Sequence, residues 1–347
     1  GLVRVAAATP TASAGDVAAN VEGVLAMARR ADADGAGLVV FPELTISSYA
    51  IDDLLLQDAT LDAVEAGIAQ ILNHTLHTPP ILLVGAPLRR AVRLYNCALV
   101  IARGRILGVV PKSFLPNYRE YYEKRWFAPG VGLSGLSIDV AGTTVPFGSD
   151  LLFSANDVAD FVFHVEICED YWAPQPPSTD GALAGALILC NLSASNIVIG
   201  KARERALLSA AHSVRTLSAY AYSASGPGES TTDLAWDGQA MIHELGEQLA
   251  ESTHFGNDPE VIYADVDVQR LRLERMRNGT FNDVAIAAGH PETRFRRIGF
   301  EHRPRIADIG LERVVSRFPF VPDDPERLDA DCYEAFNIQV EGLARRF

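Results

Sequence analysis

The stretch Val165-Glu166-Ile167-Cys168-Glu169-Asp170-Tyr171-Trp172 ends an apolar run with a cysteine and continues into polar residues. From Phe161 to Cys168 apolar residues alternate along the chain, which predicts a β-strand with Cys168 at its carboxyl end. In α/β sheets, loops converge on a ligand at the carboxyl ends of the strands. Cys168 is therefore a candidate nucleophile, although most free cysteines are simply small buried apolar residues.

Two charged side chains follow other strands in the same way. The apolar run Leu38–Phe41 predicts a strand buried on both faces, and Pro42 and Glu43 come directly after it. A β-rich arm from Arg105 to Val110 is followed by Pro111 and Lys112. Taken singly, a glutamate or a lysine at such a place is as readily an ordinary solvated residue.

Composition narrows the class of protein. The 347 residues include 44 acidic and 30 basic side chains, a formal net charge of −14, which argues against binding of nucleic acid or an anionic membrane as a main activity. We find no apolar run of about 18 residues and no secretory signal, so a cytoplasmic location and no membrane partner are expected. The four cysteines are widely spaced, which predicts no disulfide framework, no metal site and a reducing compartment.

The remaining pattern alternates strands and helices. A β-α-β opening, a β-hairpin around Gly104, a helix over Lys201–Ser218 and a β-meander over 237–267 are expected. The long irregular segment 113–135 is rich in tyrosine and charge, and it predicts either a functional loop or a docking surface. We predict one domain over residues 1–288, followed by a linker and helical segment over 289–347.

Glu43, Lys112 and Cys168 together supply the groups that amide hydrolysis through a thioester requires. A base must take the thiol proton, a cation must stabilise the developing oxyanion, and the departing ammonia must receive a proton. Glu43 fits the first and third tasks. Lys112 fits the second, together with the backbone N–H of Glu169.

In these contexts the sequence resembles the nitrilase, or carbon-nitrogen hydrolase, superfamily, and within it the glutaminase domains of glutamine-dependent NAD synthetases. The resemblance covers essentially the whole chain. The matching segments are 41–49, 52–55, 111–113, 115–120, 166–170, 191–195, 229–238 and 331–337.

The resemblance implies a four-layer α-β-β-α sandwich that hydrolyses L-glutamine and passes ammonia to a synthetase domain, which amidates deamido-NAD. It implies Glu43 as general base, Lys112 as oxyanion stabiliser and Cys168 as nucleophile. The residues it implies for the substrate pocket are Tyr49, Tyr118, Glu123, Glu169, Ser195 and Lys201.

The same resemblance implies that ATP and magnesium bind only at a synthetase domain, with no cofactor in this chain, and that the protein forms a homo-oligomer. The sequence lacks the family's Ser-Gly-Gly-x-Asp-Ser pyrophosphate loop, so we expect an excised N-terminal domain. Two alternatives stay open. One is a free-standing amidase of the same superfamily, and the other is a catalytically idle assembly module.

Overall fold

The computed structural model describes residues 1–231, 234–315 and 328–346. It divides into a compact unit, Gly1–Glu312, and a second unit, Arg313–Phe347, in which α8 spans Leu328–Ala344. Thr232 and Asp233, which belong to one matching segment, and residues 316–327 of the predicted linker lie outside the described residues. The predicted boundary at residue 288 stays a prediction.

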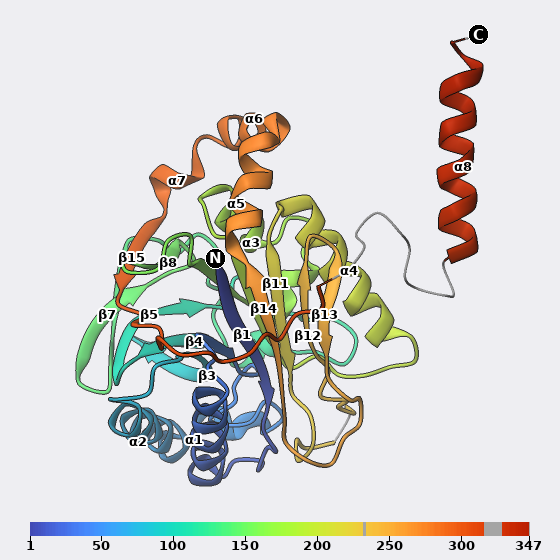
Figure 1. Ribbon diagram of the computed structural model, residues 1–347. Coiled ribbons are helices and arrows are strands. Elements are labelled where there is room, and N and C mark those ends of the chain that lie inside the picture. The colour runs from blue at the N-terminus through green and yellow to red at the C-terminus, as the bar shows by residue number, and fades with distance from the viewer. Residues whose placement is uncertain (232–233, 316–327, 347) are drawn as a thin grey trace. The chain divides into compact units, whose positions relative to one another are not determined.

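The large unit contains two β-sheets (Figure 1). The first has the order β14 (Glu260–Asp267), β1 (Leu2–Thr9), β2 (Leu38–Val40), β3 (Ile81–Arg90), β4 (Arg93–Ala102), β5 (Arg105–Pro111), β7 (Thr143–Phe147) and β6 (Leu136–Val140). The second has the order β13 (Glu247–Glu251), β12 (Ala240–Glu244), β11 (Ala219–Ala224), β10 (Ile188–Ser193), β9 (Val162–Ile167), β8 (Leu151–Ala155) and β15 (Arg296–Phe300).

Helices cover the outer face of each sheet, while the inner faces pack against each other. On the first sheet α1 (Val17–Ala33) and α2 (Asp58–His74) bury an apolar stripe against the strands. On the second sheet α3 (Pro177–Leu183) and α4 (Lys201–Thr216) pack against the strands, but the buried residues of α4 are polar: Arg205, Ser209, His212, Ser213 and Thr216. Apolar side chains of both sheets form one core between them. This confirms the predicted four-layer α-β-β-α sandwich.

Two stretches differ from the sequence prediction. The expected meander over 237–267 is split, because β14 leaves the second sheet and pairs antiparallel with β1 of the first along its whole length. Residues 296–300, assigned to an irregular linker, form β15, which pairs parallel with β8. Alternation of apolar residues marks a strand but does not say which sheet receives it, and this explains the first error.

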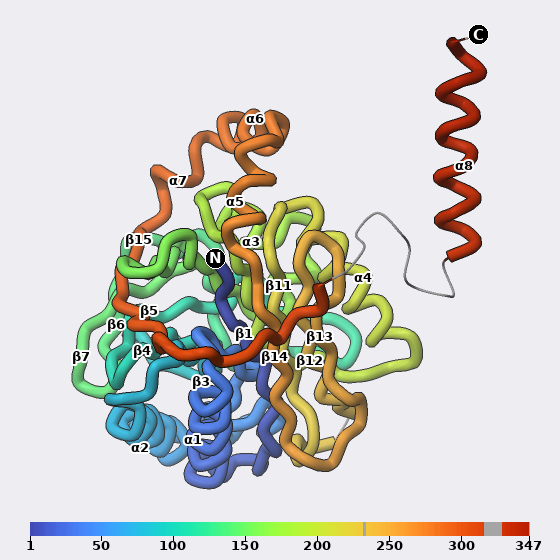
Figure 2. Tube along the Cα trace, viewed as in Figure 1, coloured from blue at the N-terminus to red at the C-terminus, as the bar shows by residue number. Residues whose placement is uncertain are grey.

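The helices α5 (Val268–Arg277), α6 (Gly279–Ala287) and α7 (Pro291–Arg294) lead from β14 to β15. The chain then returns across the first sheet, as the tube in Figure 2 shows. Arg4 fixes this return by pairing with Asp265 at 2.9 Å and donating to the carbonyls of Ile309 and Gly310. Among the helices of the described ranges, none is long and apolar enough to cross a membrane.

Strand direction brings loops from both sheets to one edge. β1, β2 and β3 run parallel to one another, as do β9, β10 and β11. The segment after β2 crosses directly over Gly85 of β3, whose carbonyl accepts the N–H of Ile46 at 3.1 Å. A Cβ on Gly85 would lie 2.3 Å from the backbone nitrogen of Leu44 and 2.7 Å from the carbonyl oxygen of Pro42.

We therefore expect Gly85→Ala to destabilise the protein by about 3 kcal/mol, the upper range for overpacking, because backbone atoms cannot move aside as a flexible side chain does. Urea denaturation measures the change in the free energy of unfolding. Gly279→Ala is the matched control, because a Cβ there meets nothing within 4 Å. Equal effects of the two substitutions would contradict the prediction.

Candidate active site

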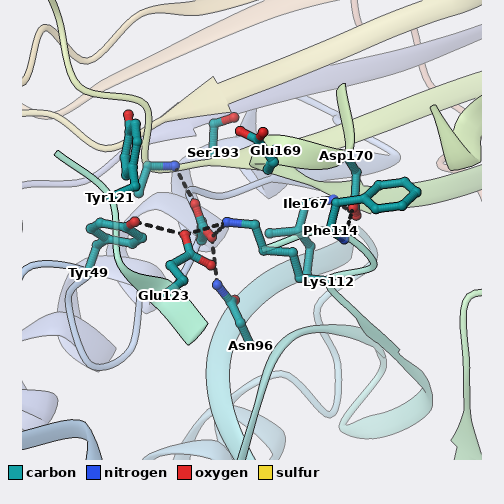
Figure 3. Close-up of polar contacts among 12 residues, drawn as sticks. Tyr49, Asn96, Lys112, Phe114, Tyr121, Glu123, Ile167, Glu169, Asp170 and Ser193 are labelled. Carbon is teal, nitrogen blue, oxygen red and sulfur yellow. Dashed lines mark hydrogen bonds and ion pairs between the residues drawn. The ribbon is translucent and has the colours of Figure 1, made fainter. Parts of the chain in front are cut away.

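A buried ammonium between two carboxylates forms the centre of the site (Figure 3). The Nζ atom of Lys112 lies 2.6 Å from Glu43 Oε1 and 2.6 Å from Glu123 Oε1, and all three side chains are at most 1% exposed. Glu43 follows β2, Lys112 follows β5, and Glu123 begins a short 3₁₀ helix, Glu123–Arg125, inside the long loop. Segment 113–135 thus supplies a member of the site, as its functional interpretation requires.

Glu43 is held by groups from both sheets. Its Oε1 also accepts the side-chain N–H of Asn96 at 2.6 Å, and its Oε2 accepts the backbone N–H of Ala194 at 2.8 Å. The backbone N–H of Glu43 donates to Ser193 O at 3.2 Å. Because β10 ends at Ser193, the second sheet fixes a carboxylate that the first sheet carries.

Cys168 stands at a sharp bend. β9 ends at Ile167, and Cys168 begins a 3₁₀ turn with a positive φ of 45°. A non-glycine residue in this region costs about 1–3 kcal/mol, so the surroundings must hold the bend in place. The carboxylate of Asp170 does so by accepting the backbone N–H groups of Ile167 at 3.1 Å, Ser113 at 3.2 Å and Phe114 at 2.8 Å. Asp170 thereby ties the Cys168 turn to the loop that follows Lys112.

Burial and charge set the protonation of the site. Burial alone would lower the pKa of Lys112, but the charges of Glu123 and Glu43 outweigh it and raise that pKa well above its ordinary value. Burial, and then the charge of Glu43, raise the pKa of the Cys168 thiol, and the opposing effect of Lys112 is smaller. In the structure the resting thiol keeps its proton, so it needs a base.

The Glu123 carboxyl group has a pKa close to neutral pH. Burial raises its pKa from 4.5 to about 7, although Lys112 pulls the pKa downward. Tyr49 donates its hydroxyl to Glu123 Oε1 at 2.8 Å, while Glu123 Oε2 has no partner in the part of the chain that the structure describes. We expected Tyr49 to line the substrate pocket, and the structure places its hydroxyl against Glu123. Its role toward a substrate stays a prediction.

A cavity of about 210 Å³ opens onto Cys168. It is lined by four of the other predicted pocket residues, Tyr118, Glu169, Ser195 and Lys201. The Tyr118 hydroxyl donates to Glu169 Oε1 at 2.9 Å, and burial raises the pKa of Glu169. The cavity therefore presents a carboxylate and an ammonium to a ligand, together with the buried hydroxyl of Ser195, which lacks a partner within the described residues.

Several residues of this site were given no role by sequence reasoning. Asn96 donates directly to Glu43, and Asp170 accepts the backbone N–H groups of Ser113 and Ile167, the chain neighbours of Lys112 and Cys168. The buried Glu229 accepts the backbone N–H groups of Tyr49 at 2.9 Å and Ala50 at 3.3 Å. Asn96 has a usable signal, since a polar residue inside an apolar strand needs a buried partner. Nothing in the sequence pattern says which partner that is.

No group of three or more histidine, cysteine, aspartate or glutamate side chains able to hold a metal ion occurs within residues 1–231, 234–315 and 328–346.

The family model for carbon-nitrogen hydrolases matches residues 4–276. The chain belongs to the carbon-nitrogen hydrolase family.

Relatives of this carbon-nitrogen hydrolase chain are about twice its length. The glutamine-dependent NAD(+) synthetase of Mycobacterium tuberculosis is 56% identical over 346 residues, which is 100% of this chain and 51% of that protein. A crystal structure of the enzyme of the same name from Cytophaga hutchinsonii matches with a TM-score of 0.68 and 27% identity, over 77% of this chain and 43% of that one. The chain thus spans about half the length of these relatives.

A shorter protein shares the fold. The amidase of Nesterenkonia AN1, from the nitrilase superfamily, matches with a TM-score of 0.59 and 20% identity, over 79% of this chain and 95% of that one. At this identity the likeness concerns the fold alone.

Replacing Glu123 with glutamine should change how stability depends on pH. A carboxyl group whose pKa is raised by folding favours the protonated folded state, so its contribution is full below about pH 4.5 and is lost as the pH rises through about 7. Glutamine cannot ionise. We therefore compare the free energies of unfolding of Glu123→Gln and the wild type. As the pH rises from 4.5 to 8, the difference between them should shift in favour of the variant by about 3 kcal/mol. Urea denaturation across this range measures it, and a pH-independent difference would refute it.

Replacing Asp170 with asparagine should loosen the Cys168 turn. Asparagine offers one acceptor oxygen where three backbone N–H groups now bind a carboxylate, so at least one buried N–H loses its partner. We expect a loss of about 2 kcal/mol in the free energy of unfolding. Asp283→Asn, which makes the same change at an exposed position of α6, should stay within about 0.5 kcal/mol. Similar losses in both variants would exclude this role of Asp170.

Proposed function

We propose that this carbon-nitrogen hydrolase domain is the glutaminase of a glutamine-dependent NAD synthetase. The observation that carries the proposal is the Lys112 ammonium, which contacts Glu43 and Glu123 at 2.6 Å each. Near it, Cys168 lines a cavity that also contains an acidic and a basic side chain. An α-amino acid carries an ammonium and a carboxylate, and such a cavity complements both.

The proposed first half-reaction forms a thioester. Glu43 takes the proton of the Cys168 thiol as the sulfur attacks the side-chain carbonyl carbon of glutamine. The Lys112 ammonium and the backbone N–H of Glu169 stabilise the oxyanion. Glu43 then gives the proton to the amide nitrogen, the C–N bond breaks, and ammonia leaves. The acyl group stays on the Cys168 sulfur.

In the second half-reaction water replaces ammonia. Glu43 takes a proton from a water molecule, whose oxygen attacks the thioester carbonyl. The proton returns to the Cys168 sulfur as the C–S bond breaks, and glutamate is released. The two contacts of Glu43 with Asn96 and Ala194 keep the carboxylate in one orientation through both steps.

The charged side chains of the cavity suggest how the substrate is oriented. In the proposal Glu169, to which Tyr118 is bonded, accepts the α-ammonium of glutamine. Lys201 and the unpartnered hydroxyl of Ser195 are suited to the α-carboxylate. Glu123 acts from behind Lys112, and Tyr49 orients Glu123.

We extend the proposal to the whole protein through the relatives that this chain half covers. Ammonia made here would pass to a synthetase domain that amidates deamido-NAD, with ATP and magnesium bound by that domain. A homo-oligomeric assembly and a cytoplasmic location complete the proposal. The synthetase role is supported by the 56% identity with a named glutamine-dependent NAD(+) synthetase.

The alternatives have less support. The amidase of Nesterenkonia AN1 is matched over 95% of its own length, but at only 20% identity. A small aliphatic amide also leaves unexplained why Glu169 and Lys201 face one cavity. An idle assembly module leaves unexplained three buried charges that burial disfavours.

The decisive experiment measures ammonia and glutamate release from L-glutamine, with asparagine and propionamide as other amides. We expect turnover of glutamine above both, and a loss of more than about 10³-fold in kcat for Cys168→Ala and for Glu43→Gln, because each removes a group that acts in both half-reactions. Cys97→Ala is the matched control, since it truncates another buried free cysteine. Preferred turnover of propionamide would replace the glutaminase with a general amidase.

A further inference from the structure

The ammonium of Lys201 is held by two neighbours from other segments. Its Nζ donates to Asn196 Oδ1 at 2.6 Å and to the Tyr121 hydroxyl at 3.3 Å. The rings of Tyr121 and Trp172 lie 5.6 and 5.7 Å from the ammonium. Lysine is a point charge on a flexible stem and lacks the rigid fork of arginine, so its direction depends on such contacts.

The hydrogen bonds around Asn196 allow one consistent assignment. Glu120 accepts the Asn196 Nδ2 at 2.7 Å, and because an ionised carboxylate only accepts, the amide nitrogen must face Glu120. The amide oxygen therefore faces Lys201. The Tyr121 hydroxyl accepts from Lys201 and from the backbone N–H of Asn196, so its own proton goes to Asn196 Oδ1.

These contacts join three parts of the site. Glu120 and Tyr121 lie in the loop after β5, Asn196 follows β10, and Lys201 begins α4. Glu120, Tyr121 and Lys201 all line the cavity at Cys168. The two bonds occupy two of the three N–H groups of the ammonium and leave the third for a ligand. We call Glu120, Tyr121 and Asn196 the clamp.

We propose that the clamp positions Lys201 so that its remaining N–H meets the α-carboxylate of the substrate, which restricts the site to amides carrying that group. The inference rests on the proposed glutaminase function. Tyr121 and Asn196 are positioning residues, since they act through Lys201. The α-carboxylate contact is equally strong before and during the reaction, so loss of the clamp changes KM and leaves kcat unchanged.

Steady-state kinetics with two substrates test this role. 4-Aminobutanamide keeps the reacting amide and the amine of glutamine but lacks the α-carboxylate. In Asn196→Ala and Tyr121→Phe we expect KM for L-glutamine to rise about tenfold with kcat unchanged, as for loss of one charge-assisted contact. The kcat/KM for 4-aminobutanamide should not change. Added to Lys201→Met, Asn196→Ala should have no further effect on glutamine.

The matched control is Arg203→Ala, which removes an exposed cation from the same turn of α4 and should leave both substrates unaffected. A fall in kcat for both amides, or equal losses in kcat/KM for both, would overturn the clamp, because it would show general damage to the site. Clamp variants equal to an active wild type would overturn it as well. A wild type that releases no ammonia from glutamine would instead refute the proposed function. It would also refute the inference that the clamp directs Lys201 toward the α-carboxylate of glutamine.

Discussion

The site depends on the enclosure of one ammonium by two carboxylates away from water. A single buried charge of this kind is strongly unfavourable, and the Lys112 ammonium is tolerable only because Glu43 and Glu123 each contact it at 2.6 Å. The three groups come from segments 69 and 11 residues apart, so the contacts exist only when the first sheet and the long loop are in place. The ion pairs thus favour the one arrangement of these segments in which all three charges meet.

The second sheet enters through Glu43. Ala194 and Ser193, at the end of β10, bond to the side chain and backbone of Glu43, while Asp170 links the Cys168 turn to the loop after Lys112. The inner apolar core holds the two sheets together, but it is not directional. These hydrogen bonds fix the position of one sheet relative to the other at the edge where the catalytic groups meet.

The sequence alone predicted those catalytic candidates that a local pattern indicates. Glu43, Lys112 and Cys168 each follow an apolar strand, and the structure brings Glu43 and Lys112 into contact as expected. The fold came from the family resemblance, with strand periodicity in agreement. Partners set by tertiary packing were out of reach, because no periodicity tells that Asn96 faces Glu43 or that Tyr49 faces Glu123. For the same reason the transfer of β14 to the first sheet was missed.

The raised pKa of the Cys168 thiol is compatible with its role as nucleophile. A thiolate formed by loss of a proton to water would add a negative charge to a buried cluster that already contains Glu43 and Glu123, and burial opposes this. Transfer of the proton from Cys168 to Glu43 leaves the net charge of the cluster unchanged. The negative charge then moves to the carbonyl oxygen of the substrate, where Lys112 is already fixed. The site therefore disfavours loss of the Cys168 proton to water and favours its transfer to Glu43. The negative charge reaches the oxyanion position only when an amide substrate is bound.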